Sequence, residues 1–268
     1  MKLVDLPLTA GVGLYQRTIE KIAEGVRDFP VLSLYLQGGF SAPGVSDIDL
    51  IILHPDDDKC ARMDALRLSS PAVHGLSECE RALFTHSIAV MRRSELRDVR
   101  YLYGGANPKY VAGVDVDFCS DEDTKVSLNS LILGIEFLPL RWSELAALSV
   151  AEDLPVRKLL MLGHSVCHSI GVASKFASRE RGWSSYEKAS ARFRGLQSSH
   201  EFNSAELQAF LMRSERVVRE LMLAFEVELL KRVAVGADAP VVDPGWFLNH
   251  RRRVTLSLIH ISEPTRPY

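Results

Sequence analysis

The chain has 268 residues, 47% of them hydrophobic and 25% charged, with 32 Lys and Arg against 34 Asp and Glu. These proportions exclude a disordered or fibrous chain, and the net charge of −2 gives no global field that would attract nucleic acid. No apolar run reaches the roughly 18–20 residues that cross a bilayer, so we expect no membrane partner. The four cysteines form no CxxC pair and no dense framework, and we therefore expect a cytoplasmic protein with reduced thiols.

The end of the chain needs separate treatment. Residues 256–268 read LSLIHISEPTRPY, and the first eleven match one reading frame of the transposon-end adapter used in sequencing libraries. We exclude this tail from the fold as an adapter-derived artefact and expect the native C-terminus to be missing.

The first half of the chain predicts a mixture of helices and strands. Apolar residues at helical spacing predict a helix over 8–28, which Pro30 ends. Two short apolar runs at 31–36 and 48–53 predict buried strands, with a segment rich in Gly, Ser and Pro between them. Beyond these we expect a polar surface helix and two further strands, at 56–67, 87–91 and 111–119.

After about residue 125 the strand patterns stop and long helical periods follow. A helix is predicted from Asp153 to Arg181, and a capping-box-like pattern begins another at Asn203. The sequence therefore predicts an α+β protein, with an α+β domain over 1–125 and an all-helical domain over 126–255.

One segment carries the chemistry. A buried strand leads into Gly38 and Gly39, and a short loop then leads to Asp47 and Asp49 at the start of the next strand. The alternation of a strand predicts that both carboxylates lie on one face. Such a pair repels unless a cation compensates it, and ligation by oxygen alone favours Mg²⁺ or Mn²⁺. The glycine pair allows close approach of the backbone, whose amides can hold phosphate oxygens.

This segment resembles the signature of the polymerase-β-like nucleotidyltransferase superfamily. Gly38, Gly39, Asp47 and Asp49 match its pattern of Gly, Gly or Ser, a loop, and Asp-hydrophobic-Asp. The resemblance implies the nucleotidyltransferase fold, a small mixed sheet with flanking helices, followed by a helical domain. It also implies a Mg²⁺-dependent enzyme that moves a nucleoside monophosphate from an NTP, with ATP as the expected donor, to a hydroxyl.

The family requires a third carboxylate on a neighbouring strand, and the sequence leaves its position open. Asp117 is our first choice for this metal-binding and catalytic position, and Asp115 is the second. The third strand of aminoglycoside adenylyltransferases, aligned without gaps, instead places Ser87 there, with His86 on the opposite face. If no third acid is present, the chain would be slow or would bind nucleotide without turnover.

The loop between Gly39 and Asp47 contains no basic residue, so the charge of a triphosphate needs compensation from elsewhere. Ser41 is a candidate donor to a phosphate oxygen. The candidate cations are two pairs of neighbouring residues, Arg92 with Arg93 and Arg157 with Lys158.

Two features of the helical region have simpler interpretations than a second site. His164 and His168 are spaced to share a zinc ion, but no further ligands follow at a suitable spacing, so we interpret them as core or edge histidines. The basic and aromatic stretch at 179–194 contains Glu180 and Glu187, which favours a solvated helix face over an RNA-binding surface.

Two hypotheses remain for the function. In the first, the chain is a nucleotidyltransferase whose acceptor is a hydroxyl of a small molecule, such as an aminoglycoside-like compound, or of a protein. The near-neutral charge argues against a polynucleotide acceptor. In the second, a catalytically degenerate fold of the same kind acts as an antitoxin-like or regulatory binding protein.

Overall fold

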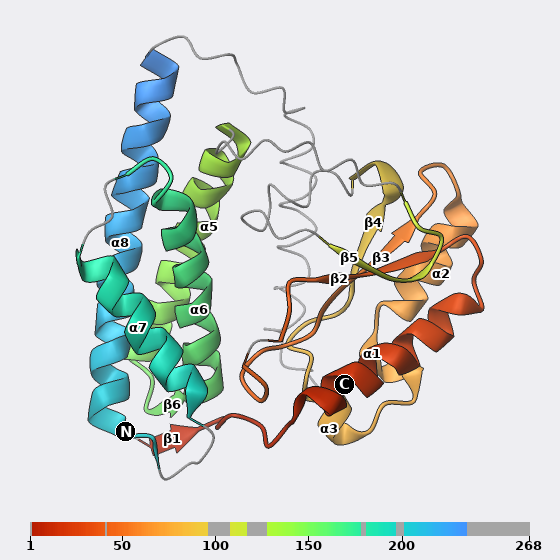
Figure 1. The fold of residues 1–268 in the computed structure, drawn as a ribbon, viewed down its shortest axis with the longest axis horizontal. Coiled ribbons are helices and arrows are strands. Elements are labelled where there is room, and N and C mark those ends of the chain that lie inside the picture. Colours follow the sequence, from red (N-terminus) through yellow and green to blue (C-terminus); the bar gives the residue numbers. More distant parts are fainter. Residues whose placement is uncertain are drawn as a thin grey trace, which may run out of the picture.

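The computed structural model describes residues 2–40, 42–95, 108–116, 128–177, 181–196 and 201–234. These residues form an α+β structure in two parts (Figure 1). We call residues 8–116 the sheet half and residues 128–234 the helical half. In Figure 1 the sheet half lies on the right and the helical half on the left.

The sheet half contains a four-stranded mixed sheet in the order β4-β3-β2-β5. Its strands are β2 (Ser33–Gln37), β3 (Asp49–His54), β4 (Ala89–Arg92) and β5 (Lys109–Gly113). Strand β2 is antiparallel to β3 and to β5, whereas β3 and β4 are parallel. The register pairs Gln37 with Asp49 and Ile51 with Ala89. The strand expected at 111–119 is β5 in the structure, where it begins earlier, at Lys109, and ends at Gly113.

Two helices, α1 (Val12–Arg27) and α2 (Lys59–Leu68), pack against one face of this sheet. The alternation of β3 explains this, because Leu50 and Ile52 point into their shared core. The expected helix over 8–28 is confirmed as α1, which ends at Arg27, before Pro30. The short helices η1 (Pro71–His74) and α3 (Glu78–Arg81) connect α2 to the segment that leads into β4.

The helical half consists of α5 (Leu128–Ser149), α6 (Val156–Ala173), α7 (Arg181–Gly195) and α8 (Ser204–Ala234). Aromatic side chains, among them Trp183, Tyr186 and Phe210, fill its core. Asn203 caps α8 as expected, with its side chain accepting from two backbone amides of the first turn. Helix α6 ends at Ala173, earlier than the Arg181 predicted. None of the described helices is both long and apolar enough to cross a membrane.

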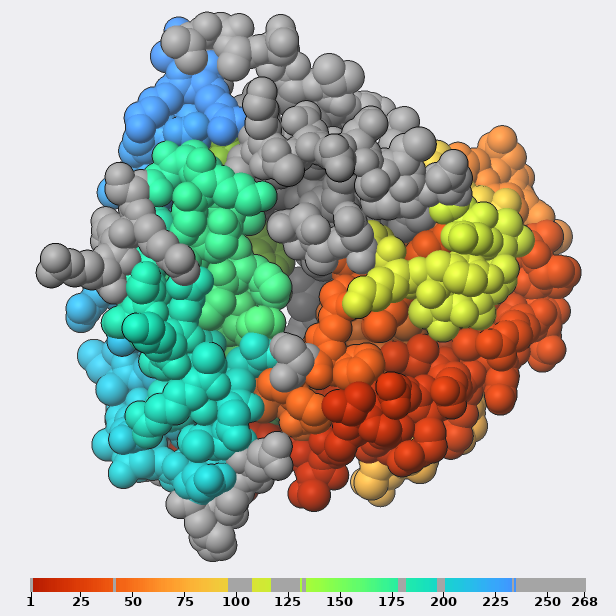
Figure 2. Space-filling model, in the orientation of Figure 1, coloured from red at the N-terminus to blue at the C-terminus, as the bar shows by residue number. Residues whose placement is uncertain are grey.

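Contacts between the halves converge on the loop that precedes Asp47. Ala42 and Val45 of this loop belong to the apolar core of the helical half. The N-terminal strand β1 (Lys2–Val4) also crosses over, because it pairs in parallel with β6 (Asp153–Pro155) just before α6. In the space-filling view, the turquoise helical residues meet the orange residues of the sheet half in the lower part of the molecule (Figure 2). The loop is therefore held from both sides.

Candidate metal and nucleotide site

The site begins at the glycine pair that ends β2. Gly38 has a φ of +70°, a left-handed conformation that favours glycine. A Cβ built on Gly38 or Gly39 would meet no other atom within 4 Å. The backbone at this turn therefore faces open space, which leaves room for a ligand to approach its amides.

The next loop is held by the Tyr15 side chain of α1. The Tyr15 hydroxyl donates to the Ser46 carbonyl oxygen at 2.6 Å and accepts from the Gly44 amide at 3.0 Å. Gly44 has a φ of +87°, and a Cβ there would lie 2.1 Å from the Leu8 carbonyl oxygen. This close approach requires glycine at position 44, so the loop is packed against Leu8 just before it reaches Asp47.

Asp47, Asp49 and His86 form one cluster in which the possible ligand atoms all lie within 4.8 Å of one another. The Nε2 atom of His86 is 2.8 Å from Oδ1 of Asp49 and 3.9 Å from Oδ2 of Asp47. The Thr85 hydroxyl donates to the same Asp47 oxygen. The side chains of Asp49 and His86 are 43% and 42% exposed, against 17% for Asp47, so a ligand can enter from the Asp49 side.

The prediction that His86 points to the opposite face is wrong. It assumed that the alternation of β4 extends back to residue 86, but β4 begins at Ala89. The chain bends at Thr85 and His86, so the two-residue period does not apply there. This bend turns the imidazole toward the aspartates, with Nε2 of His86 2.8 Å from Oδ1 of Asp49.

The charges of the cluster perturb one another strongly. Burial raises the pKa of Asp47, and the neighbouring Asp49 carboxylate raises it further. The hydrogen bond from His86 to Asp49 raises the pKa of His86 to about 9, so the imidazole balances part of this negative charge. A pair of carboxylates that needs such compensation is suited to a divalent cation, and the donors present, two carboxylates and an imidazole, are ordinary ligands of one.

The structure does not place every predicted site residue in the cluster. Asp117 and Ser41 lie outside the described residues. The carboxylate of Asp115 accepts from the Tyr35 hydroxyl at 3.0 Å and is not part of the cluster. Within the part of the chain that the structure describes, the third group that could ligate a metal beside the two aspartates is therefore His86.

Three of the four cations suggested by the sequence make contacts away from the aspartate side chains. Arg92 is the last residue of β4, opposite His54 in the register of β3 and β4, and Arg93 follows it. The guanidinium of Arg93 donates to the Val31 carbonyl oxygen. Arg157 is only 6% exposed and donates to the carbonyl oxygens of Ala82 and Val45. Arg157 of α6 therefore links the helical half to the sheet half.

Sequence reasoning missed Arg194 of α7. Its guanidinium lies 2.7 Å from Nδ1 of His164 and 3.4 Å from Oγ of Ser46, the residue before Asp47. Within the stretch assigned to a solvated face, Trp183 and Tyr186 are core residues. The spacing of these buried aromatic residues could have indicated that α7 packs closely, but not that Arg194 reaches the sheet half.

The paired histidines of α6 are unsuited to zinc. Their Nε2 atoms are 3.2 Å apart, but Nδ1 of His164 is occupied by Arg194. Burial and the Arg194 charge lower the pKa of His164 to about 4, and burial lowers that of His168. The positive charge of Arg194 disfavours a second cation next to His164.

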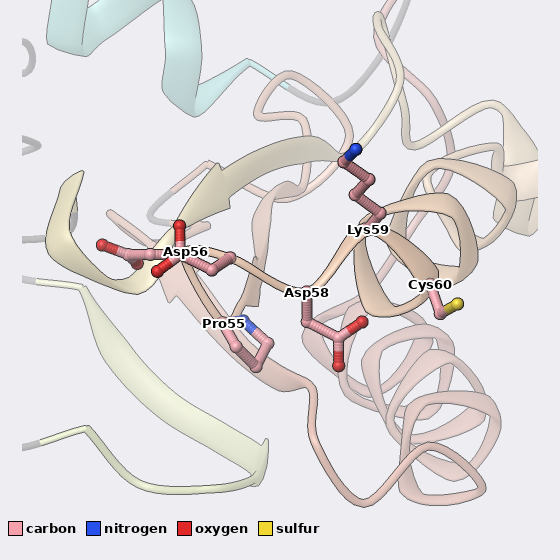
Figure 3. A pocket seen from close by; sticks show the side chains of 6 residues that line it. Pro55, Asp56, Asp58, Lys59 and Cys60 are labelled. Atoms are coloured by element: carbon pink, nitrogen blue, oxygen red, sulfur yellow. The ribbon is translucent and has the colours of Figure 1, made fainter.

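A surface depression lined by residues 55–60 lies at the other end of β3 (Figure 3). One of its acidic side chains, Asp58, caps α2 by accepting from the Ala61 amide. Strand β3 separates this depression from Asp49 by roughly 16 Å, the length of a six-residue strand. The depression is therefore not part of the aspartate cluster.

Comparisons with known proteins add no relative. No family model matches the chain, and no curated protein or solved structure matches it.

Proposed function

We propose that the chain is a cation-dependent nucleotidyltransferase that moves a nucleoside monophosphate from an NTP, ATP in the first instance, to a hydroxyl. The observation that carries this proposal is the position of the Asp47–Asp49 pair next to the glycine turn, because Asp49 pairs with Gln37, the residue before Gly38. Carboxylates that hold a cation next to backbone amides are the parts that a phosphoryl-transfer site requires.

In this proposal, the aspartates hold the cation, which would neutralise negative charge on the phosphates. The amides at Gly38 and Gly39 bind phosphate oxygens, and Arg194 supplies positive charge next to Ser46. The acceptor oxygen forms a bond to the α-phosphorus while the bond from this phosphorus to the bridging oxygen breaks. Pyrophosphate leaves, and the hydroxyl proton passes to water at the exposed side of Asp49.

The acceptor that we propose is a small hydroxylated molecule or a protein hydroxyl. The formal charge of −2 supports this choice, because a polynucleotide acceptor would need a basic groove. The helical half borders the loop before Asp47 and would form the acceptor side of the site.

The second candidate is a regulatory protein that binds nucleotide without transferring it. The observation that favours it is that, among the described residues, no third carboxylate joins Asp47 and Asp49. Binding of ATP without any transfer would support this candidate.

The test is incubation with α-labelled NTPs, Mg²⁺ or Mn²⁺, and panels of small hydroxylated compounds and proteins. We expect label on an acceptor and released pyrophosphate, with at least a 100-fold loss in Asp49→Asn. Asp57→Asn, at the opposite end of β3, is the matched control and should keep full activity. Transfer that survives in Asp49→Asn would overturn the proposal.

A further inference from the structure

Ser87 determines which nitrogen of His86 faces the aspartates. Nδ1 of His86 lies 2.8 Å from the Ser87 carbonyl oxygen, which can only accept a hydrogen bond. Nδ1 therefore carries a hydrogen, and Nε2, which donates to Asp49, is the nitrogen that would bind a cation after releasing its proton to solvent. Metal-binding histidines are commonly oriented in this way, by donating from the other ring nitrogen to a carbonyl.

The distances in the cluster suit one shared ion. Ligand atoms that bind the same small divalent cation at about 2.1 Å lie roughly 3–4 Å apart. Nε2 of His86 lies 2.8 Å from an Asp49 oxygen and 3.9 Å from an Asp47 oxygen, close to these separations. The hydroxyl of Thr85 orients the Asp47 carboxylate in turn. Both the imidazole and one carboxylate are thus held by a second set of contacts.

We propose that His86 is a ligand of the bound cation and that the site therefore prefers a first-row transition-metal ion, with Mn²⁺ as its representative, over Mg²⁺. This inference rests on the cation site of the proposed function, but it does not depend on the acceptor. Mg²⁺ is a hard ion that takes oxygen ligands, whereas imidazole nitrogen suits the transition metals. Replacing a third carboxylate by an imidazole therefore weakens Mg²⁺ binding more than Mn²⁺ binding.

The experiment measures metal binding without substrate. Mn²⁺ is titrated into the full chain and followed by electron paramagnetic resonance, and Mg²⁺ is added as competitor. Pulsed measurements on bound Mn²⁺ detect a coordinated imidazole through its ¹⁴N coupling. We expect one coupled nitrogen and at least about a tenfold preference for Mn²⁺ over Mg²⁺.

Two substitutions distinguish ligation from a structural role. His86→Gln should lose the nitrogen coupling and weaken Mn²⁺ binding by about 10–100-fold. His86→Asp should also lose the coupling, but it should bind Mg²⁺ more tightly than wild type because its donors are all oxygen. His74→Gln, which changes a histidine outside the cluster, is the matched control and should leave both metals unaffected. Circular dichroism of each variant verifies that it is folded.

The outcomes separate this inference from the proposed function. Bound Mn²⁺ without nitrogen coupling, or unchanged metal preference in folded His86→Asp, would overturn the role of His86 and leave nucleotidyl transfer standing. Nitrogen coupling without any transfer would support the role of His86 and contradict the enzyme. Absence of metal binding in the wild type would overturn both.

Discussion

His86 in the sheet half and His164 in the helical half are the same side chain with neighbours of opposite charge. His86 lies against Asp47 and Asp49, and its pKa is raised to about 9. His164 lies against Arg194, and burial together with this guanidinium lowers its pKa to about 4. The two sides of the loop before Asp47 therefore differ in charge: the sheet half contributes the Asp47 and Asp49 carboxylates, and the helical half contributes the Arg194 guanidinium.

The two halves also differ in packing. The turn at Gly38 and Gly39 faces open space, whereas Gly163 of α6 lies directly against the rings of the helical core. A binding site needs open space of the kind found at Gly38 and Gly39, whereas a well-packed core leaves no such space. Four tests, in decreasing order of expected effect, probe these contrasts.

The largest effect is expected at the joint between the halves. Arg157→Met keeps most of the side-chain volume but removes the donor to the Ala82 carbonyl oxygen, which lies 2.7 Å from Nη1. We expect the free energy of unfolding to fall by about 2–4 kcal/mol, measured by urea denaturation. The neighbouring, exposed Lys158→Met should stay within about 0.5 kcal/mol. Equal stabilities for the two variants would show that Arg157 does not hold the halves together.

A pair of glycine substitutions tests the contrast in packing. In Gly163→Ala the new Cβ would lie 2.7 Å from the Phe210 ring, so we expect a loss of about 1–3 kcal/mol in unfolding free energy. Gly39→Ala should change stability by less than about 0.5 kcal/mol, because its Cβ meets no atom within 4 Å. Calorimetry should nevertheless show weaker ATP binding to Gly39→Ala. Normal nucleotide binding by this variant would separate Gly39 from the phosphate site.

In the sheet half, substitution of Glu80 tests how much an ion-paired carboxylate contributes to stability. Lys21 and the Ser77 capping box lower the pKa of Glu80 to about 2. The lowered pKa means that this stabilisation is present above pH 4.5 and is lost as the pH falls toward 2. We expect Glu80→Gln to lose about 1–2 kcal/mol of unfolding free energy at pH 7, with a difference from wild type that vanishes near pH 2. A difference independent of pH would exclude the ion pair as its cause.

The smallest effect is expected from His164 and falls in a different pH range. Its folded pKa lies below the ordinary value of 6.5, so stability is full above pH 6.5 and falls as the pH drops toward 4. His164→Gln should reduce this decline by about 1 kcal/mol, and the lowered pKa of His168 should account for part of what remains. Denaturation curves at pH 7 and pH 5 measure the loss of stability in the wild type and in His164→Gln. A steeper decline in the variant would contradict the assigned charge environment.

Local periodicity predicted a large part of the fold. The apolar runs around Gly38 and Asp47 became β2 and β3, and helical spacing located α1. Element ends were less predictable, because α6 stops at Ala173 and β5 ends at Gly113 through contacts that local sequence does not specify. The pairing of β1 with β6 joins residues 2–4 to residues 153–155, and nothing in either short segment indicates the other.

Local sequence was enough to predict the aspartate pair and its face, because Ile48 and Leu50, which alternate with the two carboxylates, point into the core. The surroundings of that pair depend on the tertiary structure. The bend at Thr85 turned His86 toward Asp49, and the packing of α7 brought Arg194 to Ser46, 148 residues earlier in the chain. The physical reason is that alternation within a strand follows from backbone geometry alone, whereas contacts between distant segments depend on how the whole core packs.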